Sequence, residues 1–208
     1  MRIRKSADTR KAEIIDAALR IADRLGPERL TTEAVAAAVG LTQPGIFRHF
    51  PKKQDLWQAV AAHVGAAMEA RWTKAHSPDA APLDQIRVLI AAQLRLIEST
   101  PAIPAILFSR ELHTKNKGLR QAFLGLMGRF HRLIAGLVAR ARESGDLRSD
   151  LDADDAAFLI VGLVQGLAVR WSISGRHFDL AEEGKRLLEL QLSGFARGNG
   201  PADKGTAP

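Results

Sequence analysis

Residues 41–56 read LTQPGIFRHFPKKQDL and hold side chains that can contact the bases and phosphates of DNA. The side-chain amide of Gln43 can bind adenine, and the guanidinium of Arg48 can bind guanine or a phosphate. Pro44 and Gly45 lie between them and are slim enough to let the backbone approach a nucleic acid. The stretch therefore predicts contact with DNA through this part of the chain.

Two short helices are expected around this stretch. Thr32 is the predicted N-cap of a helix over residues 33–39, which Gly40 ends. Thr42 can cap the next helix, and Pro51 limits it to about two turns, since the residue before a proline avoids the helical conformation. Two short helices with such a turn are typical of a helix-turn-helix, in which the second helix lies in the major groove.

Basic residues are concentrated near this motif. Residues 1–60 carry eleven Lys or Arg against seven Asp or Glu, within a chain of net charge +7 and pI near 10.2. Lys53 begins a further helix, where its ammonium and the free backbone amides of the first turn can bind one phosphate. The arm with Arg2, Arg4 and Lys5 either reaches a neighbouring groove or phosphate or is a disordered tail. The charge favours a polyanionic partner.

The rest of the 208-residue sequence has helical periodicity, with apolar residues recurring every three or four positions. No stretch shows the sustained alternation typical of strands. We expect an all-α fold of about nine helices. Besides the two helices of the motif, the pattern predicts helices ending at residue 25 and over 53–74, 83–98, 105–113, 119–143, 152–174 and 180–195.

The domain organisation follows from the interruptions of this pattern. The segment HSPDAAP at 76–82 contains two prolines and a polar turn, and it separates two groups of helices. The expected parts are a flexible basic arm at 1–8, a helix-turn-helix domain at 9–53, a connecting helix at 54–75, a larger helical domain at 83–196 and a disordered tail at 197–208.

The run from Thr32 to Leu56 resembles the DNA-binding region of TetR-family transcriptional regulators. The matching residues at their present spacing are Val35-Ala36, Gly40-Leu41-Thr42, Gly45-Ile46-Phe47, His49-Phe50 and the segment from Lys53 to Leu56. The family usually has tyrosine in place of Phe47, so a hydroxyl contact to phosphate is lost here. Together with the residues above, the resemblance implies these DNA-contacting residues: Thr32, Thr42, Gln43, Pro44, Gly45, Phe47, Arg48, His49 and Lys53.

The resemblance also implies a larger domain that binds a small molecule, and a homodimer formed through the last two long helices. Candidate residues of a partly apolar pocket are Phe108, Leu112, Phe123, Met127, Phe130, His131, Gln165 and Trp171, for which plain hydrophobic core is the alternative. Candidates for the dimer interface are Gly162, Gly166, Leu187 and Leu190. The two glycines are four apart and admit a close helix, from a partner or from the same chain.

Other chemistry finds little support in the sequence. Cysteine is absent, which excludes disulfides and thiolate ligands. Glu111, His113 and His131 lack a recognisable ligand spacing, so we expect no metal and no cofactor. Ser109 near His113 has no nucleophile context, and we expect no enzyme. No apolar run approaches the roughly 18 residues that span a bilayer and no secretory signal is evident, so we expect no membrane association and a cytoplasmic location.

These observations together predict a homodimeric, sequence-specific DNA-binding transcriptional regulator. Repression of a palindromic operator, with release by a small ligand, is the mode implied by the resemblance. Two alternatives remain: an architectural DNA-binding protein without an inducer, and an all-α enzyme that uses the cavity of the larger domain.

Overall fold

A computed structural model describes residues 6–75, 77 and 79–196. These residues form an all-α fold, as predicted, and the only β-type pairing among them is an isolated bridge between Leu147 and Ala196. The expected arm Arg2, Arg4, Lys5 and the tail at 197–208 lie outside the described residues. The elements are α1 (Ala7–Leu25), a 3-10 turn η1 (Pro27–Arg29), α2 (Thr32–Ala38), α3 (Gln43–Phe47), α4 (Lys53–Ala75), α5 (Pro82–Ser99), α6 (Ala102–Phe108), α7 (Arg110–Lys115), α8 (Lys117–Glu143), α9 (Ala153–Ile173) and α10 (Leu180–Phe195).

The described part of the chain has ten α-helices where about nine were expected, because the segment predicted as one helix over 105–113 forms two. Ser109 leaves the helical conformation with φ −73° and ψ 99°, and its hydroxyl accepts a hydrogen bond from the amide of Leu112 at 3.1 Å. Ser109 thereby caps α7 and separates it from α6. Pro104 lies within the first turn of α6, where a missing N–H does no harm, so this proline does not break the helix.

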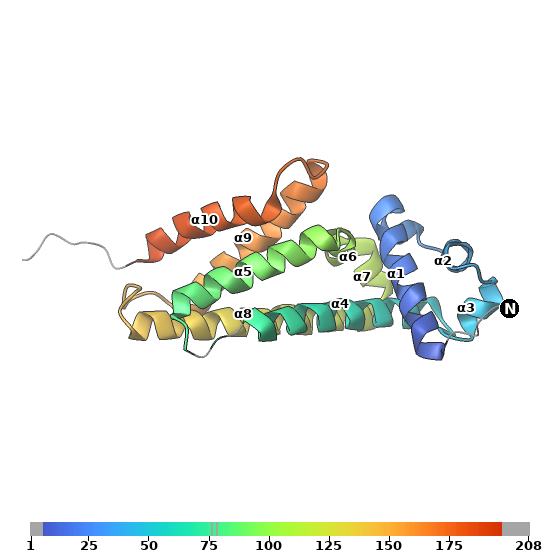
Figure 1. The fold of residues 1–208 in the computed structure, drawn as a ribbon, viewed down its shortest axis with the longest axis horizontal. Helices are drawn as coiled ribbons and strands as arrows, with labels where there is room; N and C mark the ends of the chain where they lie inside the picture. The colour runs from blue at the N-terminus through green and yellow to red at the C-terminus, as the bar shows by residue number, and fades with distance from the viewer. Residues whose placement is uncertain (1–5, 76, 78, 197–208) are drawn as a thin grey trace, which may run out of the picture.

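Helices α1, α2 and α3 form one end of an elongated molecule (Figure 1). α1 begins at Ala7, after its N-cap Ser6, so it starts within the segment expected to be a flexible arm. Gly26 ends it with φ 87°, a conformation that favours glycine. Fully buried side chains of Ile14, Leu30 and other apolar residues hold this end together.

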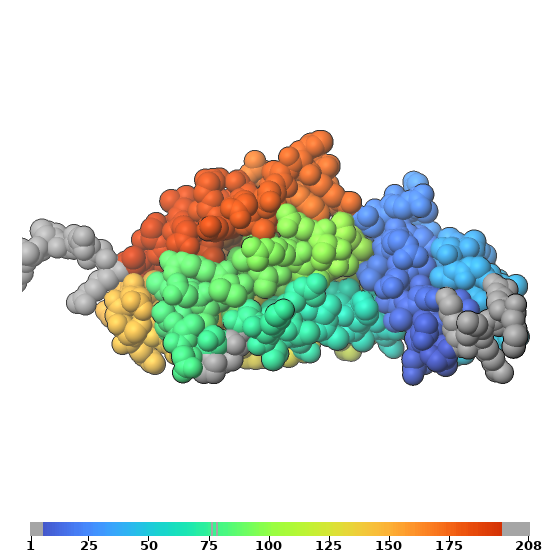
Figure 2. Space-filling view, viewed as in Figure 1, coloured from blue at the N-terminus to red at the C-terminus, as the bar shows by residue number. Residues whose placement is uncertain are grey.

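The larger domain is a bundle in which α4 and α8 run along the length of the molecule (Figure 1). Helix α5 packs on both of them, α9 packs on α8, and α10 packs on α5 and α9. Each helix has an apolar stripe that meets the others in one continuous core. Figure 2 shows α10 along one long edge of the surface, with α1 and α2 at the end away from it. α4 belongs to both parts, since it packs against α1 at one end and against α5 and α8 along its length.

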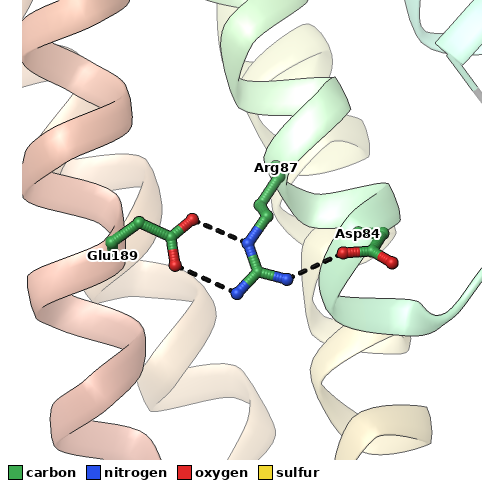
Figure 3. A network of polar contacts seen from close by, with 3 residues as sticks. All are labelled: Asp84, Arg87 and Glu189. Atoms are coloured by element: carbon green, nitrogen blue, oxygen red, sulfur yellow. Dashed lines mark hydrogen bonds and ion pairs between the residues drawn. The ribbon is translucent and has the colours of Figure 1, made fainter.

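A polar network joins α5 to α10 (Figure 3). The guanidinium of Arg87 donates to both carboxylate oxygens of Glu189, at 2.6 and 3.0 Å, and to Asp84 at 2.8 Å. The Arg87 guanidinium holds the pKa of Glu189 below its ordinary value. This two-point contact joins the exposed edges of α5 and α10 beside their apolar contact.

Two helices, α8 and α9, are long and apolar enough to cross a membrane by length and composition alone. In the sequence we found no apolar run of this length, so this finding differs from the expectation. The two helices pack against each other, α8 also contacts α4 and α5, and α9 also contacts α10. Core helices of soluble proteins have the same composition, so these two do not indicate a membrane protein.

Candidate functional site

The turn between α2 and α3 orients the predicted recognition helix. Gly40 has φ 65°, which ends α2, and the amide of Leu41 returns to the carbonyl of Ala36 at 2.9 Å. Thr42 caps α3 as predicted, since its hydroxyl accepts from the amide of Gly45 at 3.3 Å. Ile46 is fully buried and anchors the inner side of α3 in the core. The anchor leaves the opposite side of α3 free.

The exposed side of α3 carries some of the residues predicted to contact DNA. Pro44 and Arg48 are exposed, and Phe47 keeps 40% of its surface accessible although it is a large aromatic. His49 is half-buried, and Lys53 is exposed at the start of α4. An aromatic ring beside exposed cations is suited to packing on sugar or a thymine methyl while the charges bind phosphate.

The N-cap of α2 is Thr31, and the prediction of Thr32 for this role was wrong. The hydroxyl of Thr31 accepts from the amide of Ala34 at 3.1 Å. Thr32 is the first residue of α2 and is only 8% exposed. Either threonine can cap a helix. The burial of Val35 and Ala36 favours Thr31, because it sets the position of the first turn of α2.

The buried Thr32 instead binds the recognition helix. The side-chain amide nitrogen of Gln43 donates to the Thr32 hydroxyl at 3.0 Å and also to the carboxylate of Glu33. The backbone N–H of Glu33 lowers the pKa of its own carboxyl, assisted by Thr31, Thr32 and the charge of Lys53. The carboxylate therefore stays ionised at neutral pH and accepts the hydrogen bond from Gln43.

Two residues near this surface were missed by the sequence analysis. Lys52 is exposed beside Lys53, and its backbone amide donates to Asp55 at 2.9 Å, which caps the start of α4. Glu33 was predicted only as the first residue of the helix over residues 33–39. The contact of Glu33 with Gln43, ten positions away, leaves no local signal in the sequence. Lys52 was predictable, because it directly precedes the predicted contact residue Lys53.

A second feature is an apolar cavity inside the larger domain. Its lining comes from five helices: Met68, Trp72, Gln93, Ile97, Ile103, Pro104, Leu107, Phe108, Phe123, Leu126, Met127, Phe130, Val161, Val164, Gln165 and Ala168. Among these described residues only two glutamines are polar and none is charged. One wall is held rigid, because the Trp72 ring stacks on Phe130 at 4.9 Å and its indole N–H donates to Gln93 at 3.0 Å.

The structure places five of the eight candidate pocket residues in this cavity: Phe108, Phe123, Met127, Phe130 and Gln165. The other three lie elsewhere. Leu112 is buried near Pro27 of η1 and Trp57 of α4. The indole of Trp171 donates to the carbonyl of Phe178 at 3.0 Å. His131 contacts the backbone carbonyl of Asp154 at 3.2 Å.

The candidates for the dimer interface lie toward solvent. At Gly162 and Gly166 no atom of another described helix lies within 4 Å of where a Cβ would stand, so no other helix in the described part of the chain packs closely there. Leu190 of α10 is 66% exposed and Leu187 is half-buried. Further large apolar side chains on α9 are exposed, namely Phe158, Leu159 and Ile173. This set, called the α9–α10 face below, is open to a partner.

Two contacts connect the larger domain to the DNA-binding end. The hydroxyl of Ser109, at the end of α6, donates to the carboxylate of Glu28 in η1. The guanidinium of Arg176, which follows α9, pairs with Asp23 of α1 and lies 5.5 Å from the centroid of the Trp171 ring. Helix α6 itself lines the cavity and packs against α1. A displacement of α6 would therefore change the positions of α1 and η1.

Comparison with known proteins agrees with this arrangement. Residues 14–60 match the family described as bacterial regulatory proteins, tetR family, and residues 82–182 match the tetracyclin repressor-like C-terminal domain. The chain thus belongs to the TetR family of transcriptional regulators, with the N-terminal DNA-binding helix-turn-helix of that family.

Individual relatives are distant but extend over most of the chain. The transcriptional regulator TtgR of Pseudomonas putida is 28% identical over 92% of this chain and 93% of its own. The nucleoid occlusion factor SlmA of Vibrio cholerae is 23% identical over 76% of this chain and 81% of its own. The crystal structure of FadR from Bacillus subtilis in complex with stearoyl-CoA has a TM-score of 0.75 at 22% identity, covering 88% of this chain and 98% of that one.

Proposed function

We propose that the protein is a homodimeric repressor of the cytoplasm that binds a palindromic operator and leaves it when a small ligand enters the cavity. The observation that carries this proposal is the free outer side of α3, where Pro44, Phe47 and Arg48 are exposed beside the lysines of α4. A helix so presented fits the major groove, and its cations hold the flanking phosphates.

The α9–α10 face supports the dimer. Exposed leucine, isoleucine and phenylalanine side chains together with two bare glycines form an apolar surface that a second copy can cover. A twofold axis through this face gives two recognition helices in opposite orientations, which is what a palindrome requires. The spacing of the half-sites then depends on the angle between the two subunits.

The cavity supports a ligand that is largely apolar and uncharged where it is enclosed. The lining offers hydrogen bonds only from glutamines, and an unpaired charge buried there would be strongly disfavoured. A ligand that prefers a different position of α6 would shift α1 and the recognition helices, because α6 lines the cavity and also packs on α1.

An in vitro selection of random duplexes by the purified protein tests the DNA-binding part. We expect an enriched palindrome, and we expect Arg48→Ala to lose preference at one position of each half-site. Binding without any enrichment, fading only with salt, would contradict site-specific regulation.

Stearoyl-CoA is the first probe of the cavity, since the related FadR structure contains it. The cavity has a volume of about 60 Å³, so its helices must move apart to admit an acyl chain. A ligand that binds the folded state raises the melting temperature. Ala168→Phe should abolish any such rise, because the larger side chain occupies the cavity, although overpacking itself costs about 1–3 kcal/mol. A rise that is equal in both proteins would place the binding outside the cavity.

An architectural role remains the second candidate, favoured by the similarity to the nucleoid occlusion factor SlmA. This role predicts little base discrimination, a steep salt dependence and no thermal stabilisation by small molecules. The selection and the melting experiments distinguish the two functions. The third possibility, an enzyme, gains nothing from a cavity whose described lining contains no acid, base or nucleophile in reach.

A further inference from the structure

Gln43 stands at the first position of α3, where the proposed function puts a base-reading side chain. A free glutamine amide reads adenine with two hydrogen bonds, donating to N7 and accepting from N6. In the structure, however, the amide nitrogen of Gln43 already has two acceptors, the hydroxyl of Thr32 and the carboxylate of Glu33. An NH₂ group has two hydrogens, so both are used.

The orientation of this amide is fixed by chemistry. A carboxylate without a proton can only accept hydrogen bonds, so the Gln43 atom facing Glu33 must be the nitrogen. The backbone N–H of Glu33 lowers the pKa of its carboxyl, which therefore remains an acceptor at neutral pH. The side-chain carbonyl oxygen of Gln43 is the polar atom left for DNA.

We propose that Glu33 is a specificity-determining positioning residue, which holds Gln43 so that it offers DNA an acceptor only. An acceptor can bind the N6 amino group of adenine or the N4 amino group of cytosine, whereas guanine and thymine present acceptors in the major groove. The half-site should therefore tolerate adenine or cytosine at the base read by Gln43. This inference rests on the proposed function, because it requires α3 to enter the major groove.

The test is the selection experiment with wild type, Glu33→Ala and Asp8→Ala. In wild type, we expect one half-site position to hold adenine and cytosine at similar frequency. In Glu33→Ala, the freed amide can donate to N7 of adenine, so the ratio of adenine to cytosine there should rise about tenfold. Asp8 is an exposed carboxylate in the first turn of α1, so Asp8→Ala removes the same charge and should leave the ratio unchanged.

The variant Gln43→Ala identifies the half-site position that Gln43 reads. Selection with this variant should lose the base preference at that position and keep the preferences at the other positions. Glu33 is solvent-exposed, so its replacement should leave the fold intact, which circular dichroism checks. A palindrome with adenine alone in wild type would overturn the inference while the proposed function stands, and so would an unchanged ratio in Glu33→Ala. Failure of the wild type to enrich any palindrome would overturn the proposed function and this inference with it.

Discussion

Ser109 and Glu28 are 81 positions apart, yet the hydroxyl of Ser109 donates a hydrogen bond to the Glu28 carboxylate. The contact joins the end of α6, which lines the cavity, to the turn that precedes α2. Ser109 has a second role, since it also caps α7. The two roles can be separated by mutation.

We expect Ser109→Ala to lower the free energy of unfolding by about 1 kcal/mol from the lost cap, in addition to the lost contact with Glu28. Glu28→Ala should lose only the contact. Urea unfolding of both single variants and the double variant gives their coupling energy, which we expect to be about 1 kcal/mol. Additive effects would mean that the contact between α6 and η1 contributes nothing to stability.

Gly45→Ala separates folding from DNA binding. A Cβ at this position would lie 3.4 Å from the Thr42 hydroxyl oxygen, an ordinary contact, so the protein has room for it. Stability should stay the same or rise by up to about 1 kcal/mol, as for other helical Gly→Ala changes. Affinity for the operator should fall by about 1 kcal/mol or more, as for loss of one base contact, because the methyl group keeps the backbone from the DNA. Unchanged affinity would show that Gly45 does not approach the duplex.

The sequence predicted the elements whose signals are local. Thr42, the proline and glycine after it, and Pro51 define α3 within a few positions, and the helical periodicity gave the long helices nearly to their ends. Tertiary packing decided the rest. Thr31 and Thr32 are equal as caps until the buried Val35 sets the phase of α2.

The candidate pocket residues show the same limit. Phe123 and Phe130 face the cavity, whereas Leu112 is equally apolar and packs toward η1 instead. Helical spacing says that a residue is buried without saying which neighbour buries it. The hold of Glu33 on Gln43 was not predictable either, because it depends on how α2 and α3 meet.

The ion pair of Arg87 and Glu189 predicts a dependence of stability on pH. Arg87 lowers the pKa of Glu189 in the folded protein below its unfolded value near 4.3. The stabilisation is therefore fully present above that unfolded value and is lost as the pH falls through the lowered folded pKa. Both side chains are more than a third exposed, at 39% and 45%, so the effect should stay below about 1 kcal/mol.

Urea unfolding of wild type and Glu189→Gln at fixed protein concentration measures this difference from pH 7 downward. The two curves should converge in acid. Glu182→Gln is the matched control, since Glu182 is an exposed carboxylate of the same helix. A difference between wild type and Glu189→Gln that grows on acidification would refute the assigned sign.

The α9–α10 face predicts the effect of a charge on assembly. Ile173 is 81% exposed in the single chain, so Ile173→Glu should leave each subunit folded but place an unpaired carboxylate in the dimer interface. Sedimentation should change from twice 22.6 kDa to 22.6 kDa at micromolar concentration. Val88 on α5 is 51% exposed outside this face, and Val88→Glu should sediment as wild type does. Dissociation by both variants, or by neither, would move the interface elsewhere.

The most direct measurement for the central claim is a fluorescence anisotropy titration at physiological salt. It compares the selected palindrome with a scrambled duplex of the same length and composition. Site-specific regulation predicts that a dimer binds the palindrome about a thousandfold more tightly or better, and that Arg48→Ala removes most of this ratio. Equal affinity for both duplexes, with the same salt dependence, would contradict it.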